Sequence, residues 1–149
     1  MDLIQIGSVR SPQTEAVDEG WGDVVAEIEL QKGLGVGLQG LSEFSHALVV
    51  FFMHEARFDW KNDVLRRPRG KDDMPEIGIF AQRARSRPNS IGVSAVEILD
   101  VDGDIVRVKG LDAIDGTPIL DIKPYFPDYD YVAHARVPAW VDRLMEGYF

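Results

Sequence analysis

The sequence predicts a mainly β protein: a small single-domain β-barrel with a short C-terminal helix and a long basic surface loop. About six or seven short segments carry strand patterns, whereas only two short stretches have helical spacing. With so few helices to cover sheet edges, closure into a barrel is the economical way to remove them. The length of 149 residues suits a single domain over residues 1–149.

The first half of the chain is predicted to hold three strands. Residues 3–9 and 24–30 alternate apolar with polar side chains, a pattern typical of strands that are buried on one face. Residues 46–54 form a nearly continuous apolar and aromatic run, so we expect a central strand covered on both faces. His46 at its start is expected in or beside the core. Residues 38–45 leave room for one short helical turn.

A hairpin dominates the prediction for the second half. Residues 93–101 and 105–109 flank Asp102-Gly103, a turn signal in which both residues are expected to adopt positive φ. Residues 77–81 form a shorter strand candidate before this hairpin.

Two further elements and one loop complete the expected fold. Residues 117–122 form a strand after the turn signal Asp115-Gly116. Residues 138–148 have helical spacing behind a proline suited to a first turn. Residues 62–76 are polar, basic and interrupted by prolines, which indicates a long surface loop.

Composition excludes several kinds of site. The chain has no cysteine, which rules out disulfides and thiolate nucleophiles, and its three scattered histidines argue against a metal site. No apolar run approaches the roughly 20 residues of a membrane-spanning helix, and the first residues do not form a basic signal peptide. We therefore expect a cytoplasmic protein with no metal and no membrane association.

The basic residues are unevenly distributed. The net charge of -9 argues against nucleic-acid binding, yet nine of the sixteen lysines and arginines lie between Arg57 and Arg87, with only five acids. A solvated basic loop and a nucleic-acid surface both remain open.

A glycine motif at residues 35–40 resembles a dinucleotide fingerprint but lacks its context. Gly35, Gly37 and Gly40 match the pattern G-x-G-x-x-G after a strand. A Rossmann fingerprint must open a full helix, and here only about one turn fits before the next strand. We therefore interpret the motif as a flexible turn.

An arginine-rich loop over residues 83–89 is one candidate for binding chemistry. There Arg83, Arg85 and Arg87 can bind carboxylate or phosphate oxygens, and Pro-Asn at Asn89 indicates a shaped turn. A plain charged turn is the alternative.

Carboxylates and a histidine mark two further candidate sites. Asp112 and Asp115 precede Gly116, where turn chemistry alone would explain them. Asp121, Lys123 and Tyr125 alternate along a strand and so share one face, which suits proton removal from a polar substrate. His54-Glu55 closes the apolar strand, either as the polar rim of a ligand pocket or as a solvent-facing strand end.

These segments closely resemble the TrmO/YaeB/TsaA-like family. The resemblance covers most of the chain, including residues 6–12, 40–46, the arginine loop and residues 110–125. It implies a β-barrel methyltransferase without a Rossmann domain that works as a homodimer, with S-adenosyl-L-methionine bound near the subunit interface. The founding activity of the family is N6-methylation of threonylcarbamoyladenosine beside a tRNA anticodon. The chain carries Gln82 where the family usually has threonine and Ser90 where it usually has proline.

The resemblance also implies roles for individual residues. The implied cofactor contacts are His54, Glu55, Arg83 and the turn residues Asp112, Ala113, Ile114, Asp115 and Gly116. Asp121 or Tyr125 is the candidate that handles the proton of the acceptor nitrogen. The residues expected to face the acceptor are Arg85, Arg87, Asn89 and Lys123.

Three functions are carried forward. The first is a methyltransferase acting on modified tRNA. The second is the same barrel methylating a small molecule or another acceptor, and the third is a non-catalytic module that binds S-adenosyl-L-methionine.

Overall fold

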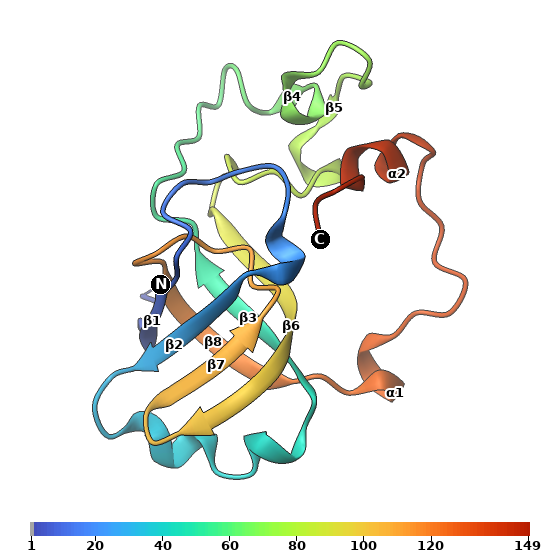
Figure 1. Cartoon of the computed structure of the whole chain (residues 1–149). Helices are drawn as coiled ribbons and strands as arrows, with labels where there is room; N and C mark the ends of the chain where they lie inside the picture. Colours follow the sequence, from blue (N-terminus) through green and yellow to red (C-terminus); the bar gives the residue numbers. More distant parts are fainter. Residues whose placement is uncertain (1) are drawn as a thin grey trace.

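A closed antiparallel barrel of six strands forms the centre of the computed structural model, which describes residues 2–149 (Figure 1). The strands follow one another around the ring in the order β1-β2-β7-β6-β3-β8. Their bounds are β1 Gly7–Arg10, β2 Val25–Leu30, β3 His46–Phe52, β6 Ile91–Asp102, β7 Ile105–Lys109 and β8 Pro118–Pro124. The predicted mainly β class and barrel closure are confirmed.

Alternating side chains fill the barrel interior. On β2, Ala26, Ile28 and Leu30 point inward and are buried, while the glutamates between them are only half-buried. Val49 and Ile119 meet them in the same core and are fully buried. Each such aliphatic side chain contributes about 1.5–3 kcal/mol by leaving water. The interior is therefore occupied by protein, and the residues available for ligand binding lie on the outside and ends of the barrel.

Only one face of β3 is covered. Its inward side chains are those of Ala47, Val49 and Phe51, each at most 2% exposed. Leu48 and Val50 point outward and are half-buried, and Phe52 is 40% exposed. The prediction of a strand covered on both faces is therefore wrong for the single chain, because a barrel covers the inner face of each strand. His46 is also exposed rather than beside the core, and its Nδ1 lies 2.8 Å from Ser45 Oγ.

Several strand boundaries differ from the predicted ones. The first strand begins only at Gly7, since Leu3 and Ile4 are 58% and 76% exposed. The candidate at 77–81 shortens to β5, Ile77–Gly78, and continues as a 3-10 turn over Ile79–Ala81.

The predicted hairpin is present, with its turn one residue later. Asp102 pairs with Ile105, so the central turn residues are Gly103 and Asp104. Gly103 has a φ of 58° and Asp104 does not have a positive φ. The expectation of two positive φ values is therefore wrong, and the turn needs glycine at its first position only.

Asp104 holds the start of the glycine motif at residues 35–40 and the turn before it. Its carboxylate accepts hydrogen bonds from the backbone amides of Gly33, at 3.3 Å, and Gly35, at 2.6 Å. The segment forms two short 3-10 helices, Leu34–Leu38 and Leu41–Glu43, and no α-helix. These two amides, which could otherwise bind a phosphate, are thus occupied by a carboxylate of the same chain. The absence of an α-helix over residues 34–43 agrees with our rejection of the dinucleotide fingerprint.

The basic loop folds into a small lobe above the barrel (Figure 1). Strand β4, Leu65–Arg66, pairs with β5, and a 3-10 turn over Pro68–Gly70 lies between them. Pro68 and Met74 are buried. The predicted surface loop at 62–76 therefore contains a short strand and two buried side chains of its own.

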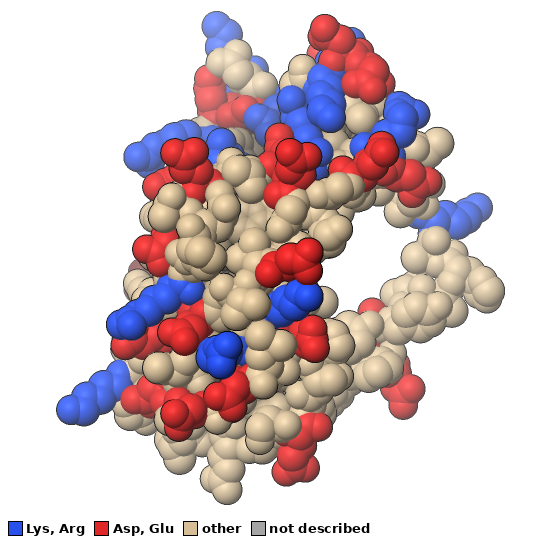
Figure 2. Space-filling view, in the orientation of Figure 1, with Lys and Arg blue, Asp and Glu red and all other residues tan. Residues whose placement is uncertain are grey.

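The C-terminal part of the chain leaves the barrel and returns to it. After β8 come the short helices α1, Pro127–Asp130, and α2, Trp140–Met145, joined by an exposed segment that arches away from the barrel (Figures 1 and 2). The predicted helix at 138–148 is shorter than expected. None of the helices within residues 2–149 is both long and apolar enough to cross a membrane.

Residues 147–149 then dock against the first 3-10 turn, Trp21–Asp23. The amides of Gly20 and Trp21 donate to the carbonyl oxygens of Gly147 and Tyr148, at 2.9 and 2.8 Å. Trp21 is 2% exposed, so this contact fixes the returning segment to a buried anchor.

Candidate functional site

Two charged side chains are anchored on consecutive residues near the start of β6. Arg83 Nη2 donates to the carbonyl oxygen of Val93 at 2.6 Å, and Ser94 Oγ donates to Asp112 Oδ1. Val93 is 42% exposed, whereas Ser94 is buried. A guanidinium bound to the backbone of Val93 and a carboxylate bound to the side chain of Ser94 thus contact β6 at neighbouring residues. Most of the N–H donors of Arg83 remain available.

Tyr148 is the second side chain, after Ser94, that donates a hydrogen bond to Asp112. Its hydroxyl donates to Asp112 Oδ2 at 2.7 Å. Burial raises the pKa of Tyr148, and the negative charge of Asp112 and the hydrogen bond to it raise that pKa further. The hydroxyl is therefore a protonated donor throughout the physiological range, and each oxygen of the Asp112 carboxylate has one neutral donor.

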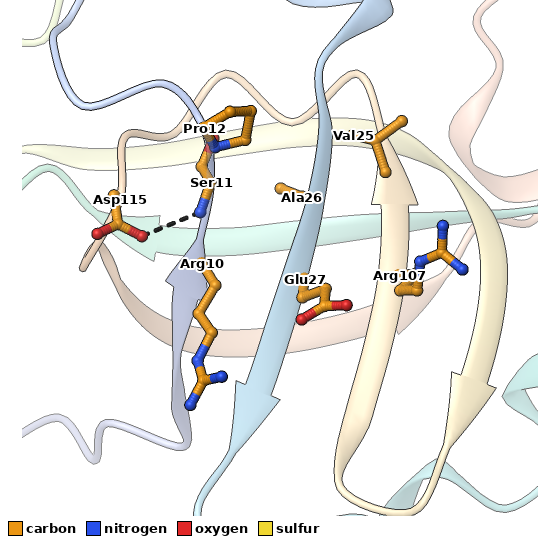
Figure 3. A pocket seen from close by; sticks show the side chains of 8 residues that line it. All are labelled: Arg10, Ser11, Pro12, Val25, Ala26, Glu27, Arg107 and Asp115. Atoms are coloured by element: carbon orange, nitrogen blue, oxygen red, sulfur yellow. Dashed lines mark hydrogen bonds between the residues drawn. The ribbon is translucent and has the colours of Figure 1, made fainter.

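The turn at 112–116 points its two aspartates in different directions. Asp115 Oδ1 accepts from the amide of Ser11 at 3.0 Å (Figure 3), and the Asp115 amide donates to Gln13 O at 2.8 Å. Ala113 and Ile114 between them are buried, and Gly116 is exposed with a φ of 76°. Of the five predicted cofactor contacts in this turn, only Asp112 forms a side-chain hydrogen bond with β6.

Asp115 instead borders a hollow on the outer wall of β1, β2 and β7. Its lining includes Arg10, Glu27 and Arg107, whose positions are in register across the three strands (Figure 3). Arg10 is already paired with Glu29 at 2.6 Å. This alternation of opposite charges is typical of a cross-strand ladder on a solvent-facing sheet.

His54 lies at the end of β3 next to the arginine loop. The amide of Met53 donates to the carbonyl oxygen of Ser90 at 2.8 Å, which joins the two segments. His54 Nδ1 is buried and has no hydrogen-bond partner among residues 2–149, whereas Glu55 is exposed. An unpaired buried ring nitrogen is costly, so this atom is a candidate ligand contact.

The residues of the arginine loop differ in what they bind. Arg87 Nη1 donates to the carbonyl oxygens of Gln82 and Ala84, at 3.0 and 3.4 Å, and so holds the loop closed. Arg85 and Asn89 are exposed. Gln82 is buried, and its Nε2 donates to the carbonyl oxygens of Arg66 and Ile77, both at 2.9 Å. The glutamine therefore fastens the lobe to the loop.

The predicted row of Asp121, Lys123 and Tyr125 is only partly brought together, because β8 ends at Pro124. Asp121 and Lys123 form an ion pair, and the hydrogen bond and charge of Asp121 raise the pKa of Lys123. The Tyr125 amide donates to His46 O at the far end of β3. Since His46 and Val50 are four residues apart, Tyr125 lies about 13 Å along the strand direction from the Asp121 row.

Asp121 faces the same side of the barrel as Val93, the residue whose carbonyl oxygen binds Arg83. In register, Val50 of β3 stands between Asp121 of β8 and Val93 of β6, and these positions face outward. Two inter-strand spacings separate Asp121 from Val93 by about 10 Å. The outer surface over β3 thus presents the Asp121–Lys123 pair on one side and, on the other, Val93, whose carbonyl oxygen binds Arg83.

Sequence reasoning missed Ser94 and Tyr148. Ser94 stood in a predicted strand and Tyr148 in a predicted helix, where neither has a motif. Their bonds to Asp112 span 18 and 36 residues, so no local pattern could have indicated them.

Comparison with known proteins gives a consistent set of relatives. A family model described as the tRNA-methyltransferase O N-terminal domain matches residues 12–131. A probable S-adenosyl-L-methionine-binding protein of Pyrococcus abyssi is 34% identical over 143 residues, which cover 93% of this chain and 74% of that protein. The tRNA (adenine(37)-N6)-methyltransferase of Mus musculus is 43% identical over 94 residues, covering 62% of this chain and 21% of the mouse protein.

A solved structure agrees over most of the chain. The crystal structure of TrmO from Pseudomonas aeruginosa superposes with a TM-score of 0.75 at 31% identity and covers 94% of this chain. The chain spans 61% of the length of that protein.

Proposed function

Because the chain belongs to the family of the tRNA-methyltransferase O N-terminal domain, we propose that it is an S-adenosyl-L-methionine-dependent methyltransferase. Its acceptor is the N6 nitrogen of threonylcarbamoyladenosine next to the anticodon of a tRNA. Relatives named for binding this cofactor and for methylating adenine in tRNA support the two halves of the proposal. An enzyme of this kind works where tRNA is used, so we place it in the cytoplasm.

The anchoring of Arg83 and Asp112 on Val93 and Ser94 carries the proposal. The methionyl end of the cofactor has a carboxylate and an ammonium group on one carbon, and a guanidinium and a carboxylate anchored on neighbouring residues offer one partner to each. Arginine binds a carboxylate with two parallel N–H donors, and Asp112 can accept from the ammonium group. His54 Nδ1, buried and unpaired among residues 2–149, offers a further polar contact.

Asp121 is the proposed acceptor of the proton. Bound S-adenosyl-L-methionine supplies an activated methyl group, so the chain has mainly to align the acceptor nitrogen and remove one proton. The ion pair with Lys123 fixes the Asp121 carboxylate on the outer surface, two inter-strand spacings or about 10 Å from Val93. Tyr125 is more distant and is the second candidate.

The lobe above the barrel is the proposed tRNA surface. Figure 2 shows lysines and arginines gathered there, mixed with acids. Five of the nine basic residues between 57 and 87 are engaged within the fold: Arg66, Arg67, Arg69, Arg83 and Arg87. Four are exposed, and their side chains form no hydrogen bond or ion pair within residues 2–149: Arg57, Lys61, Lys71 and Arg85. Trp60 and Phe80, 71% and 79% exposed, add surfaces on which unpaired bases can stack.

A homodimer is part of the proposal. The outer surface over β3 is apolar and uncovered in the single chain; it comprises Leu48, Val50, Phe52, Ile91, Val93 and Ala95. Exposed apolar faces of this kind mark protein interfaces. A second copy placed here would lie beside Arg83 and Asp121, which agrees with a cofactor bound near a subunit interface.

Two measurements test the proposal. The first is binding of S-adenosyl-L-methionine to the purified protein by isothermal titration calorimetry. The second is methyl transfer to tRNA from a strain lacking the gene, followed by mass spectrometry of the nucleosides. We expect new methylated threonylcarbamoyladenosine with the wild type and none with Arg83→Ala.

The remaining functions are outcomes of the same experiment. Methyl transfer to a small molecule but not to tRNA, together with tRNA binding that lacks a steep salt dependence, would show that the methyl acceptor is a small molecule and not tRNA. Cofactor binding with no transfer to total RNA or cell extract would make the protein a binding module.

A further inference from the structure

We propose that Tyr148 is a positioning residue of the cofactor site: it holds the Asp112 carboxylate in the orientation that receives the cofactor. The inference rests on the proposed function and adds to it a residue from the far end of the sequence. The inference is based on two hydrogen bonds that Asp112 accepts. Ser94 Oγ donates to one carboxylate oxygen, and Tyr148 Oη donates to the other at 2.7 Å.

The position of the Tyr148 ring is fixed independently of Asp112. The guanidinium of Arg69 lies 5.4 Å above the ring centre, and the ring of Phe149 packs edge-on at 4.9 Å. The Tyr148 carbonyl accepts from the amide of the buried Trp21 at 2.8 Å. A hydroxyl supported in this way can restrict Asp112, rather than merely follow it.

Arg69 itself is held in an uncommon conformation. Its φ is 52°, a left-handed value that costs free energy for a residue other than glycine. Its Nε lies 3.5 Å from Asp18 Oδ1, and its side chain is 15% exposed. The contact over Tyr148 therefore joins the lobe, the acidic segment before Trp21 and the residues after α2 at one point.

The consequence for Asp112 is a fixed carboxylate with free acceptor capacity. Ionised carboxylates have about four lone-pair sites, and the two bonds use two of them. The remaining sites can accept from an ammonium or amino group of the ligand. Without Tyr148 the carboxylate could rotate about its side-chain bonds, and the cofactor would bear the cost of fixing it.

The test compares Tyr148→Phe with the wild type by calorimetric titration with S-adenosyl-L-methionine. Phenylalanine keeps the ring contacts with Arg69 and Phe149 and removes only the hydroxyl. We expect the Kd for the cofactor to rise about tenfold, while the KM for tRNA stays unchanged. Tyr129→Phe is the matched control, since Tyr129 is 85% exposed, and it should bind as the wild type does.

Two further variants separate positioning from a general effect on folding. Ser94→Ala removes the donor to the other Asp112 oxygen and should weaken binding to a similar degree. In an Asp112→Asn background, Tyr148→Phe should have little additional effect on the Kd, because both changes act on one contact.

Each contrary result is distinct. Failure of the wild type to bind the cofactor overturns the proposed function, and this inference with it. Wild-type binding combined with an unchanged Kd in Tyr148→Phe overturns the inference alone. Tighter binding in Tyr148→Phe would also overturn it, because residues 147–149 would then obstruct the ligand.

Discussion

At the scale of single residues, Gly92 shows how the barrel limits the sequence beside the site. It faces the ring of Phe51 on the neighbouring strand, and a Cβ at this position would overlap three atoms of that ring. Gly92 immediately precedes Val93 and Ser94, which anchor Arg83 and Asp112. The absence of a side chain here therefore permits both core packing and the geometry of the site.

We expect Gly92→Ala to lower the free energy of unfolding by about 1–3 kcal/mol through overpacking. Urea denaturation measures this change. Gly37→Ala is the control, because no atom lies within 4 Å of its Cβ position, and it should be neutral or slightly stabilising. Equal effects of the two substitutions would contradict the steric explanation.

Tyr148 gives a prediction for alkaline pH. Burial and the neighbouring Asp112 raise its pKa above the ordinary value of 10.0. Above pH 10 the unfolded tyrosine ionises while the folded one stays protonated, so the stabilisation is fully present below pH 10 and is lost as the pH rises toward the folded pKa.

The stability difference between the wild type and Tyr148→Phe should therefore be constant from pH 7 to about 10 and decrease above it. Urea denaturation of both proteins across this range gives the difference, in which other titrating groups cancel. A difference that already declines between pH 7 and 9 would show that another group is responsible.

At the scale of elements, the arginine loop divides into residues that build it and residues that it displays. Arg87 closes the loop through two carbonyl oxygens, whereas Arg85 is exposed. Two arginines that stand two positions apart, in similar sequence context, are thus expected to respond differently to the same substitution.

Arg87→Ala should lower the free energy of unfolding by about 1–3 kcal/mol, because hydrogen bonds from a charged donor are lost. Arg85→Ala should leave stability unchanged and weaken tRNA binding, reducing the slope of log K against log salt by about 0.7–0.9. Fluorescence titration of tRNA at several salt concentrations measures the slope. If Arg85→Ala binds as the wild type does at every salt concentration, the arginine loop is not part of the tRNA surface.

The strands were predictable where burial on one face gives a period of two, as in residues 24–30. The same reasoning failed for β3, because an outward apolar row at Leu48, Val50 and Phe52 has the composition of a strand covered on both sides. Arg83 and Asp112 were singled out in the sequence, and the cofactor roles that the family resemblance gives them stay predictions. Their strand anchors and Tyr148 were not singled out, since hydrogen bonds across 18 and 36 residues have no counterpart in local sequence.

At the scale of the whole molecule, the apolar outer surface over β3 predicts the oligomeric state. We expect the wild type to sediment as a dimer and Val50→Asp as a monomer, because the new carboxylate would be desolvated in the interface. Val36→Asp is the matched control. Val36 is 79% exposed in the 3-10 helix Leu34–Leu38, outside the apolar outer surface over β3, so this variant should remain dimeric.

Both variants should still unfold cooperatively, since neither position points into the barrel core. A wild type that is monomeric at micromolar concentration would contradict the proposed homodimer, and the outer surface over β3 would then be available to another partner. Dissociation by Val36→Asp as well would indicate an effect of charge alone.

The closed ring of strands determines how such copies can separate. Strand β3 is paired with β6 over His46–Phe52 and with β8 over Ala47–Phe51, so it has no free edge to which a second chain could add a strand. Association through β3 would then involve side chains only, and each barrel would keep its own hydrogen bonds when the pair comes apart. Mixed populations of tagged and untagged protein should consequently exchange subunits at the rate of simple dissociation, with no need for either copy to unfold.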